Sequence, residues 1–446
     1  MRHRFRFHPP HLIARRAAVA VVVVVLSACW HVRDASAQQR PDSTTHVLRL
    51  TRQQAIHEAL ARNPTLEVSR EQVAQAQARV TQARALPEPS IGVSIQGQPA
   101  AFRPGGGNAR EVSAGITIPY PGKIILQGKV ARGELGSIDQ SYTLQRQLIV
   151  FQTNQAYDSL LVSLQHRRDL EEARTLTQGF LDKTQARFNA GTVAKLDVIK
   201  AQVSVAQAEN DLIANERGVA NARAALNRLL GRVLGASVEA ADSLTIPAVP
   251  PDFAQLEAIA IARRPELRGL QSEQAGARAQ AQLAQRYLVP DLDFSLTQSR
   301  PYGGVSEYET GIGFALPIFF WQHQRGEVAE AQHRQNELSA QYRDVAAQVG
   351  EDLRNAYATA STSYRQAVYL RDQLLPSARE AFRIASASYT LGGSSALEVI
   401  DAQRTLLDAQ TQYAAALAAV NDAIADLERA TGAPLSTLQS GGSDAR

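Results

Sequence analysis

The spacing of apolar residues changes its period along the chain and so marks out successive elements. Helical spacing of Ala, Val and Leu predicts helices over about residues 64–86 and 124–189. Between them, apolar and polar residues alternate strictly over about 90–98 and 110–119, which predicts two strands joined by a turn-rich segment. A shorter return helix is predicted over about 195–230. The predicted order is a helix, a β-hairpin and a long helical hairpin.

The second half of the chain repeats this order. A shift of 201 positions aligns Pro64 with Pro265 and Gly191 with Gly392. The same shift aligns Leu-Asp-Val-Ile-Lys-Ala-Gln at 196–202 with Leu-Glu-Val-Ile-Asp-Ala-Gln. Such matches at one fixed offset indicate a tandem duplication. We therefore expect two repeats, over 48–247 and 248–435, the second with strands over about 290–299 and 308–317 and a long helix over about 322–390 that Pro376 should kink.

The lengths of these elements point to a membrane-embedded sheet on a helical stalk. Each predicted strand has about 9–10 residues, the length of a tilted transmembrane β-strand. Each long helix would extend about 100 Å. Four strands cannot close a barrel, and open edges in lipid would leave unpaired N–H and C=O groups that each cost several kcal/mol. The strands must therefore pair with other chains, and three chains would supply twelve strands.

Composition excludes several kinds of site. The chain has one Cys and its only Met is Met1, so an internal disulfide and Cys-rich zinc sites are excluded. The formal net charge of +4 arises at the N-terminus, where residues 1–28 hold five arginines and no acid. The remainder is nearly neutral and gives no sign of nucleic-acid binding. No G-x-S-x-G, H-E-x-x-H or P-loop motif occurs, so we expect neither enzyme activity nor a cofactor or metal site.

The N-terminus resembles an export signal. A basic segment precedes an apolar run of 12 residues, 17–28, which is too short to span a bilayer but suits a signal peptide. Leu26-Ser27-Ala28-Cys29 resembles a bacterial lipobox, which predicts acylation of Cys29 after removal of residues 1–28. Ala35-Ser36-Ala37 is the competing cleavage site, which would remove residues 1–37. Residues 436–446 are predicted to form a flexible tail.

Two glycine-containing segments lie where the helical hairpins turn. They read Arg-Phe-Asn-Ala-Gly-Thr-Val-Ala-Lys-Leu-Asp-Val at 187–198 and Tyr-Thr-Leu-Gly-Gly-Ser-Ser-Ala-Leu-Glu-Val-Ile-Asp-Ala-Gln at 389–403. With the duplicated β-hairpins, they make residues 48–435 resemble the TolC-like outer-membrane efflux proteins. The segment 315–321, followed by Gln-Arg-Gly-Glu at 324–327, is similar to the heavy-metal-resistance branch of that family.

The resemblance implies a mainly α fold with a membrane β part. It implies a homotrimer whose 12-stranded β-barrel continues into a periplasmic α-barrel. The implied function is the passive exit duct of a tripartite pump in the outer membrane. Its partners would be a periplasmic adaptor (membrane fusion protein), an inner-membrane transporter of RND or ABC type, and outer-membrane lipid. A duct for type I protein secretion and a periplasmic coiled-coil scaffold without a pore are the alternatives.

The resemblance also assigns residues to the hairpin tips. Glu398 and Asp401, which share a helix face, would form acidic rings at a channel gate, and Asp197 is the first-repeat counterpart of Glu398. The alternative is that these acids only favour helix N-termini. The family prototype has a latching Arg where this chain has Ser394. Positive φ is expected at Gly191, Gly392 and Gly393, and the adaptor is expected to dock on Thr192, Val193, Ser394 and Ser395.

Overall fold

The computed structural model describes residues 48–97, 109–301, 303–315, 319 and 324–435. These residues belong to one compact unit. The expected signal peptide, the acylation site Cys29 and the tail 436–446 lie outside the described residues, as do 316 and 317 at the end of the last expected strand.

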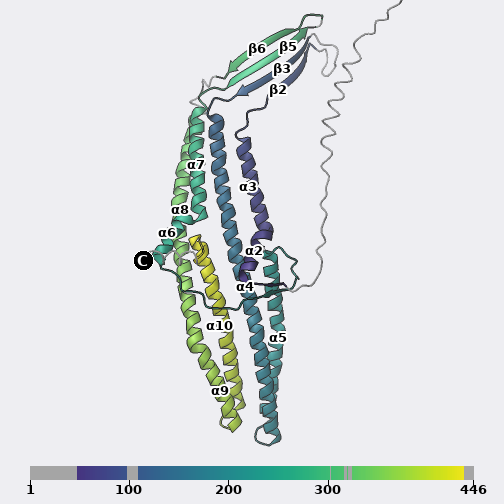
Figure 1. Ribbon diagram of the computed structural model, residues 1–446, viewed down its shortest axis with the longest axis vertical. Helices are drawn as coiled ribbons and strands as arrows, with labels where there is room; N and C mark the ends of the chain where they lie inside the picture. The colour runs from purple at the N-terminus through teal and green to yellow at the C-terminus, as the bar shows by residue number, and fades with distance from the viewer. Residues whose placement is uncertain (1–47, 98–108, 302, 316–318, 320–323, 436–446) are drawn as a thin grey trace, which may run out of the picture. The chain divides into compact units, whose positions relative to one another are not determined.

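The two halves of the chain repeat one order of elements, except for an added strand pair (Figure 1). The first half comprises β1 (Leu48–Leu50), α2 (Arg52–Arg62), α3 (Pro64–Gln82), β2 (Ser90–Gln96), β3 (Ala109–Ile118), α4 (Lys123–Asn189), α5 (Lys195–Leu229) and β4 (Val238–Ala240). The second half comprises α6 (Phe253–Arg263), α7 (Pro265–Arg286), β5 (Leu292–Pro301), β6 (Glu307–Phe314), α8 (Gln324–Tyr369), the π-helix η2 (Leu370–Leu374), α9 (Leu375–Leu391) and α10 (Ala396–Thr431).

Local capping fixes where the short helices begin. The Thr51 hydroxyl accepts a hydrogen bond from the N–H of Gln54, and the Gln54 side chain accepts one from the N–H of Thr51. The side chain of Asn63 caps α3, and Pro64 occupies its first turn, where no backbone donor is needed. These contacts separate α2 from α3 at Asn63, so that α3 begins at Pro64, where the sequence predicts a helix to begin.

The second long helix is irregular beside Pro376. The π-helix η2 occupies Leu370–Leu374, directly before the first turn of α9, which contains the proline. Proline has no N–H and its ring would clash with a preceding carbonyl, so a regular α-helix cannot continue through it undisturbed. The irregularity lies one turn before the residue that causes it.

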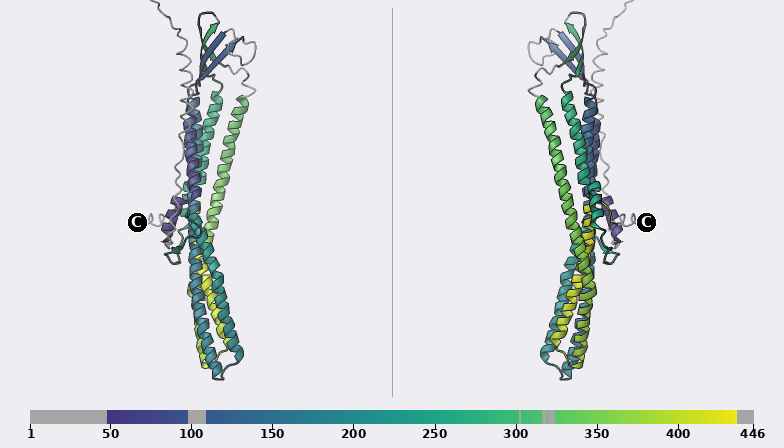
Figure 2. Two further views of the ribbon diagram at one scale, coloured as in Figure 1. Left: turned by 90° about the vertical axis from the view of Figure 1, so that its right-hand side faces the viewer. Right: turned by 90° about the vertical axis from the view of Figure 1, so that its left-hand side faces the viewer.

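The helix α4 is packed along its length by different partners. In the half nearer the sheet, it contacts α3 and α7, and α7 contacts α8. In the half nearer the tips, it contacts α5 and α10, and α10 contacts α9 (Figures 1 and 2). Helices α4 and α7 approach closely, since a Cβ on Gly133 would lie 2.5 Å from the Cα of Gly276. None of the helices in the described ranges carries an apolar stretch long enough to cross a bilayer.

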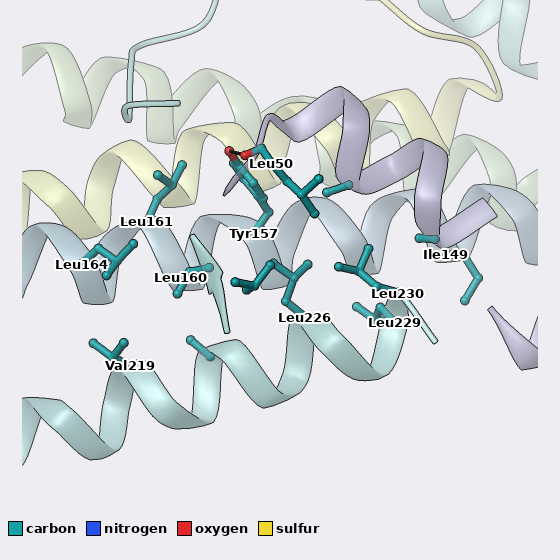
Figure 3. Close-up of a cluster of buried hydrophobic side chains, with 14 of the residues drawn as sticks. Leu50, Ile149, Tyr157, Leu160, Leu161, Leu164, Val219, Leu226, Leu229 and Leu230 are labelled. Carbon is teal, nitrogen blue, oxygen red and sulfur yellow. Dashed lines mark hydrogen bonds between the residues drawn. The ribbon is translucent and has the colours of Figure 1, made fainter. Parts of the chain in front are cut away.

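Each repeat has its own apolar core at the middle of the helices. In the first repeat, Leu66 and Leu226 are buried in a cluster with Tyr157 (Figure 3). In the second repeat, their counterparts at the 201-residue offset, Leu267 and Leu427, are buried in a separate cluster. The duplication therefore extends from the sequence to the packing.

The contacts that close each core are also duplicated. Gly231 has φ 65° and a Cβ there would meet the carbonyl oxygen of Arg62 at 2.5 Å; its counterpart Gly432 has φ 70° and lies against the carbonyl of Arg263. Both positions therefore require glycine, which tolerates positive φ without a Cβ clash. We call each of these contacts, between the glycine turn and the residues before α3 or α7, a joint. The residue directly before the helix, Asn63 or Arg264, differs between the repeats, so the two joints differ in their chemistry.

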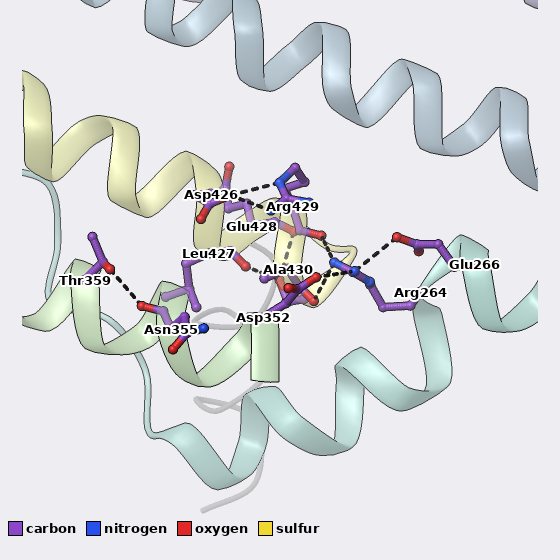
Figure 4. Close-up of polar contacts among 11 residues, drawn as sticks. Arg264, Glu266, Asp352, Asn355, Thr359, Asp426, Leu427, Glu428, Arg429 and Ala430 are labelled. Atoms are coloured by element: carbon purple, nitrogen blue, oxygen red, sulfur yellow. Dashed lines mark hydrogen bonds and ion pairs between the residues drawn. The ribbon is translucent and has the colours of Figure 1, made fainter. Parts of the chain in front are cut away.

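The joint is neutral in the first repeat and charged in the second. Asn63 donates to the carbonyl of Leu229 at 2.9 Å, at the end of α5. Its counterpart Arg264, which is 4 % exposed, donates to the carbonyl of Arg429 at the end of α10 and pairs with Glu266 and Asp352, each at 3.0 Å (Figure 4). A guanidinium has enough donors to bind both the helix end and the two carboxylates.

A short strand pair in the first repeat was not predicted from the sequence. Strands β1 and β4 pair in parallel and lie against α4. The Tyr157 hydroxyl donates to the carbonyl of Leu50 at 2.8 Å, and Arg52 forms an ion pair with Asp158, whose side chain is buried. This network holds the start of the first repeat to its long helix.

Candidate functional site

The four long strands form one antiparallel sheet in the order β2-β3-β5-β6. Its register places Ile116 opposite Phe294, and Phe294 opposite Ile312. Side chains alternate between faces along a strand, so these three lie on one face, as the sequence pattern predicts. The other apolar residues in register on that face are Ile91, Val93, Ile95, Val112, Ala114, Ile118, Leu292, Leu296 and Phe314.

The opposite face of the sheet is polar. Gln96 donates to a carboxylate oxygen of Glu111 at 2.7 Å, and the hydroxyl of Thr117 donates to Asp293 at 2.5 Å. Glycine and serine also face each other there: a Cβ on Gly311 would lie 2.5 Å from the hydroxyl oxygen of Ser295. One face thus suits lipid and the other suits water.

The sheet has free edges within the described residues. Strands β2 and β6 are its outer members, each paired on one side. Their apolar side chains are exposed, with Ile91 at 79 % and Ile312 at 74 %. An exposed edge with apolar side chains is a template for pairing with another strand. Within the described residues, the sheet therefore leaves two edges to which further strands could pair.

Lys123 joins the sheet to the helices. Its Nζ atom donates to the carbonyl of Val289 at 2.8 Å and to Asp291 at 2.7 Å, and it lies 5.2 Å from the ring centroid of Tyr287. Burial alone would raise the pKa of the Asp291 carboxyl, but hydrogen bonds from Lys123 and from the N–H of Tyr120 outweigh it and lower that pKa.

The hairpin tips turn through glycine at two of the three expected positions. Gly191 has φ 74° and Gly392 has φ 86°, so both adopt the left-handed conformation. The expectation for Gly393 is wrong, because its φ is not positive. A Cβ on Gly393 would instead lie 2.9 Å from the hydroxyl oxygen of Ser388. One left-handed residue therefore ends the helix, and the second glycine lies close to a serine hydroxyl that can rotate away.

The acids expected at the gate lie just inside two helix starts. Ser395 caps α10 by accepting a hydrogen bond from the N–H of Glu398 at 3.3 Å. Glu398 and Asp401 are exposed, and their spacing puts them on one face of α10. Asp197 is partly buried on a different helix, α5. A single chain therefore brings two of the three expected acids together.

The expected docking residues occupy the same tips with different exposure. Thr192 and Ser395 are exposed, whereas Val193 and Ser394 are partly buried. A neighbouring groove was not predicted: a cavity of about 470 Å³ lies between α4, α5 and α10, and Lys200, Arg404 and Asp408 are among its lining residues. Asp408 lies seven residues after Asp401, so it extends the exposed acidic face of α10.

A further acid lies where the two repeats meet. Burial, and then the nearby Asp158 carboxylate, raise the pKa of Asp422 on α10 to about 6. One carboxylate oxygen of Asp422 is buried without a hydrogen-bond partner. In the described part of the chain, no group of three or more His, Cys, Asp or Glu side chains could hold a metal ion.

Comparisons with known proteins match this architecture. A sequence profile described as outer membrane efflux protein matches residues 55–232 and 258–433, one match in each repeat. The cobalt-zinc-cadmium resistance protein CzcC of Cupriavidus metallidurans is 23 % identical over 385 residues, covering 86 % of this chain and 90 % of that protein. The outer membrane protein TolC of Salmonella enteritidis is 26 % identical over 397 residues, covering 81 % of this chain and 77 % of TolC.

Solved structures share the fold at low sequence identity. The structure of CusC superposes with a TM-score of 0.74 at 19 % identity, covering 89 % of this chain and 96 % of CusC. The outer-membrane channel OprN superposes with a TM-score of 0.71 at 18 % identity, covering 85 % of this chain and 89 % of OprN.

Proposed function

Because the chain belongs to the outer membrane efflux protein family, we propose that it is the outer-membrane exit duct of a tripartite efflux pump. Members of this family form trimeric channels that work with a periplasmic adaptor and an inner-membrane transporter. In this proposal, three copies of the chain join into a 12-stranded β-barrel that continues into a periplasmic α-barrel. Substrate passes through it without chemical change.

The observation that supports this function most strongly is the two-faced sheet with two free edges. Strand β2 of one copy can pair with β6 of the next, so three copies satisfy every edge. The apolar face then contacts lipid, and the face with Glu111 and Asp293 lines water. A periplasmic scaffold without a pore would not require an exposed apolar face on this sheet.

The hairpin tips would form the periplasmic entrance. In a trimer, Glu398 and Asp401 would each form a ring of three carboxylates. Asp197, the counterpart of Glu398, would add to the first ring, whereas Lys200 stands at the counterpart of Asp401, so the second ring would not be doubled. The adaptor would dock at the turns, on Thr192, Val193, Ser394 and Ser395, with Gly191, Gly392 and Gly393 shaping the backbone.

Reconstitution of the purified protein tests the duct. We expect a heat-modifiable trimer in the outer-membrane fraction and ion conductance when the trimer is added to planar lipid bilayers. A monomer that stays in the periplasmic extract and gives no conductance would favour the scaffold instead. The inner-membrane transporter that co-purifies with this chain then separates the pump classes. An ABC exporter with a protein substrate would indicate type I secretion.

A metal-ion cargo is the second proposal, and it concerns the pump as a whole. It is supported by the likeness to a protein named for cobalt, zinc and cadmium resistance over 86 % of this chain. A strain lacking this chain should then lose tolerance to those cations while keeping tolerance to organic antibiotics. Loss of antibiotic tolerance alone would assign a drug cargo.

A further inference from the structure

The two hairpin tips of one chain contact each other through Tyr389. Its side chain is 2 % exposed and lies in a cluster with Phe180, Ala201, Ala396 and Val399, which come from both repeats. Its ring centroid lies 5.0 Å from that of Phe180, and its hydroxyl donates to the hydroxyl of Thr184 at 3.2 Å. The side chain of Tyr389 is therefore held by helix α4 of the first repeat.

Arg187 adds a charged contact to the same residue. One of its guanidinium nitrogens donates to the backbone carbonyl of Tyr389, and the guanidinium carbon lies 4.7 Å from the centroid of the Tyr389 ring. The Nε atom of Arg187 also donates to the hydroxyl of Thr192 at 3.4 Å. The side chain thus bridges the first turn, around Gly191, and the end of α9.

The position of this bridge has an electrostatic reason. Helices α4 and α9 both end at the tips, at Asn189 and Leu391, so their negative dipole ends lie at the same end of the protein. The Tyr389 carbonyl already accepts the N–H of Gly392 at 3.0 Å, and its second lone pair faces the guanidinium. A cation here offsets two like dipole ends, which an apolar side chain could not do.

We propose that Arg187 is a positioning residue that holds the second tip against the first, and with it the carboxylates of Glu398 and Asp401. This inference rests on the proposed duct and names what regulates its entrance. Tyr389 lies at the end of α9, and Glu398 lies in the first turn of α10, just after the loop that joins the two helices. Val399, the next residue, packs in the same cluster as Tyr389. Separating the tips within one chain breaks the Arg187 contact and moves both acids. The charged bond lies at the outer end of the apolar cluster, where water can replace it.

Conductance of the full-length trimer in planar bilayers tests the role. We expect Arg187→Ala to raise the open-to-closed ratio by at least about tenfold, because the loss of even one charge-assisted hydrogen bond is worth about that factor and each of the three copies loses one. Arg187→Lys retains the charge without the planar fork and should give an intermediate ratio. Arg383→Ala is the matched control, because Arg383 on α9 pairs with Glu380 on its own helix. Wild-type gating in Arg187→Ala trimers of normal heat stability would overturn the proposal.

Hydrogen exchange at the tip separates this inference from the duct itself. Amides of residues 390–395 should exchange about tenfold faster in Arg187→Ala than in the wild type, whether or not the protein conducts. If these amides exchange at the same rate in Arg187→Ala and in the wild type, Arg187 does not hold the second tip and the proposal is overturned. A wild-type protein that forms no channel, with the exchange difference present, contradicts the proposed duct alone. If Arg187→Ala does not trimerise, Arg187→Gln provides the same comparison with less loss of volume.

Discussion

The Nζ atom of Lys123 lies 2.7 Å from the Oδ1 atom of Asp291 and ties the start of α4 to the residue before β5. Lys123 is 3 % exposed, whereas the side chain of Asp291 is 35 % exposed. The contact therefore joins the two repeats at the junction of sheet and helices.

Replacing this lysine should loosen the junction. We expect Lys123→Met to lower the free energy of unfolding by about 1–3 kcal/mol, because the Val289 carbonyl and Asp291 lose their donor. Lys129→Met, at an exposed position of the same helix, should change it by less than about 0.5 kcal/mol. Thermal unfolding in detergent, followed by circular dichroism, measures both. Equal effects of the two variants would contradict a special role for Lys123.

The same contact predicts a loss of stability in acid. The pKa of Asp291 is lowered in the folded protein, so its contribution is present above its ordinary value of 3.8 and is lost as pH falls through the folded-state pKa. Asp291→Asn should therefore show a smaller fall in melting temperature between pH 5 and pH 3 than the wild type. The difference in melting temperature between the two proteins at each pH is the measurement.

Gly133 should resist substitution although it lies inside a helix. Alanine there would place a Cβ 2.5 Å from the Cα of Gly276, so backbone must move, and we expect a loss of about 1–3 kcal/mol. Gly179 lies in the same helix with nothing within 4 Å, and Gly179→Ala should stabilise by about 0.5–1 kcal/mol. Urea unfolding of the two variants should thus shift in opposite directions; a stabilising shift in both would show that α7 can move away freely.

Asp422 predicts the opposite pH dependence from Asp291. Its pKa is raised from 3.8 to about 6 by burial and by Asp158, so the folded state is penalised as pH rises through this range, and fully above it. Asp422→Asn should raise the melting temperature at pH 7.5 and change it little at pH 3.5. Asp408→Asn, at an exposed position of the same helix, is the control and should leave the pH profile unchanged.

The proposed acidic rings predict selectivity. Replacing Glu398 and Asp401 together with Ala should reduce the preference for cations in planar bilayers, since rings of carboxylates attract cations. The reversal potential in a salt gradient is the measurement. Unchanged selectivity would leave Ser395 capping and the helix dipole as the reasons for acids at this helix start.

The sequence predicts helices and strands well where apolar residues recur at a regular spacing or where the second half of the chain repeats the first. Strict alternation of apolar and polar residues predicts two-faced strands, and the pairing of Ile116 with Phe294 agrees with it. The observed strand β5 begins two residues later than expected, at Leu292, because alternation does not mark where pairing starts. The proline beside the π-helix was also visible in the sequence, but the type of irregularity was not.

Contacts between distant segments were missed for a physical reason. Arg187 lies in the first turn segment, 187–198, which is visible in the sequence. Its partner Tyr389 lies 202 positions later and accepts through its backbone carbonyl, a group that every residue has and that therefore leaves no signature in the sequence. Strands β1 and β4 have three residues each, too short for a period to be seen. The paired glycines at 392 and 393 suggested two left-handed residues, whereas the structure uses one.

The duplicated hairpin tips, which turn at Gly191 and Gly392, have a consequence for assembly. In the proposed trimer, three copies of the two-repeat chain would present six hairpin ends of two alternating kinds, with Lys200 in one kind where Asp401 stands in the other. A ring of six identical partner subunits would then meet two chemically different neighbours around one circle. Such a ring must either bind both kinds of end or pair its own subunits two by two, so the threefold order of the channel would be imposed on its partner.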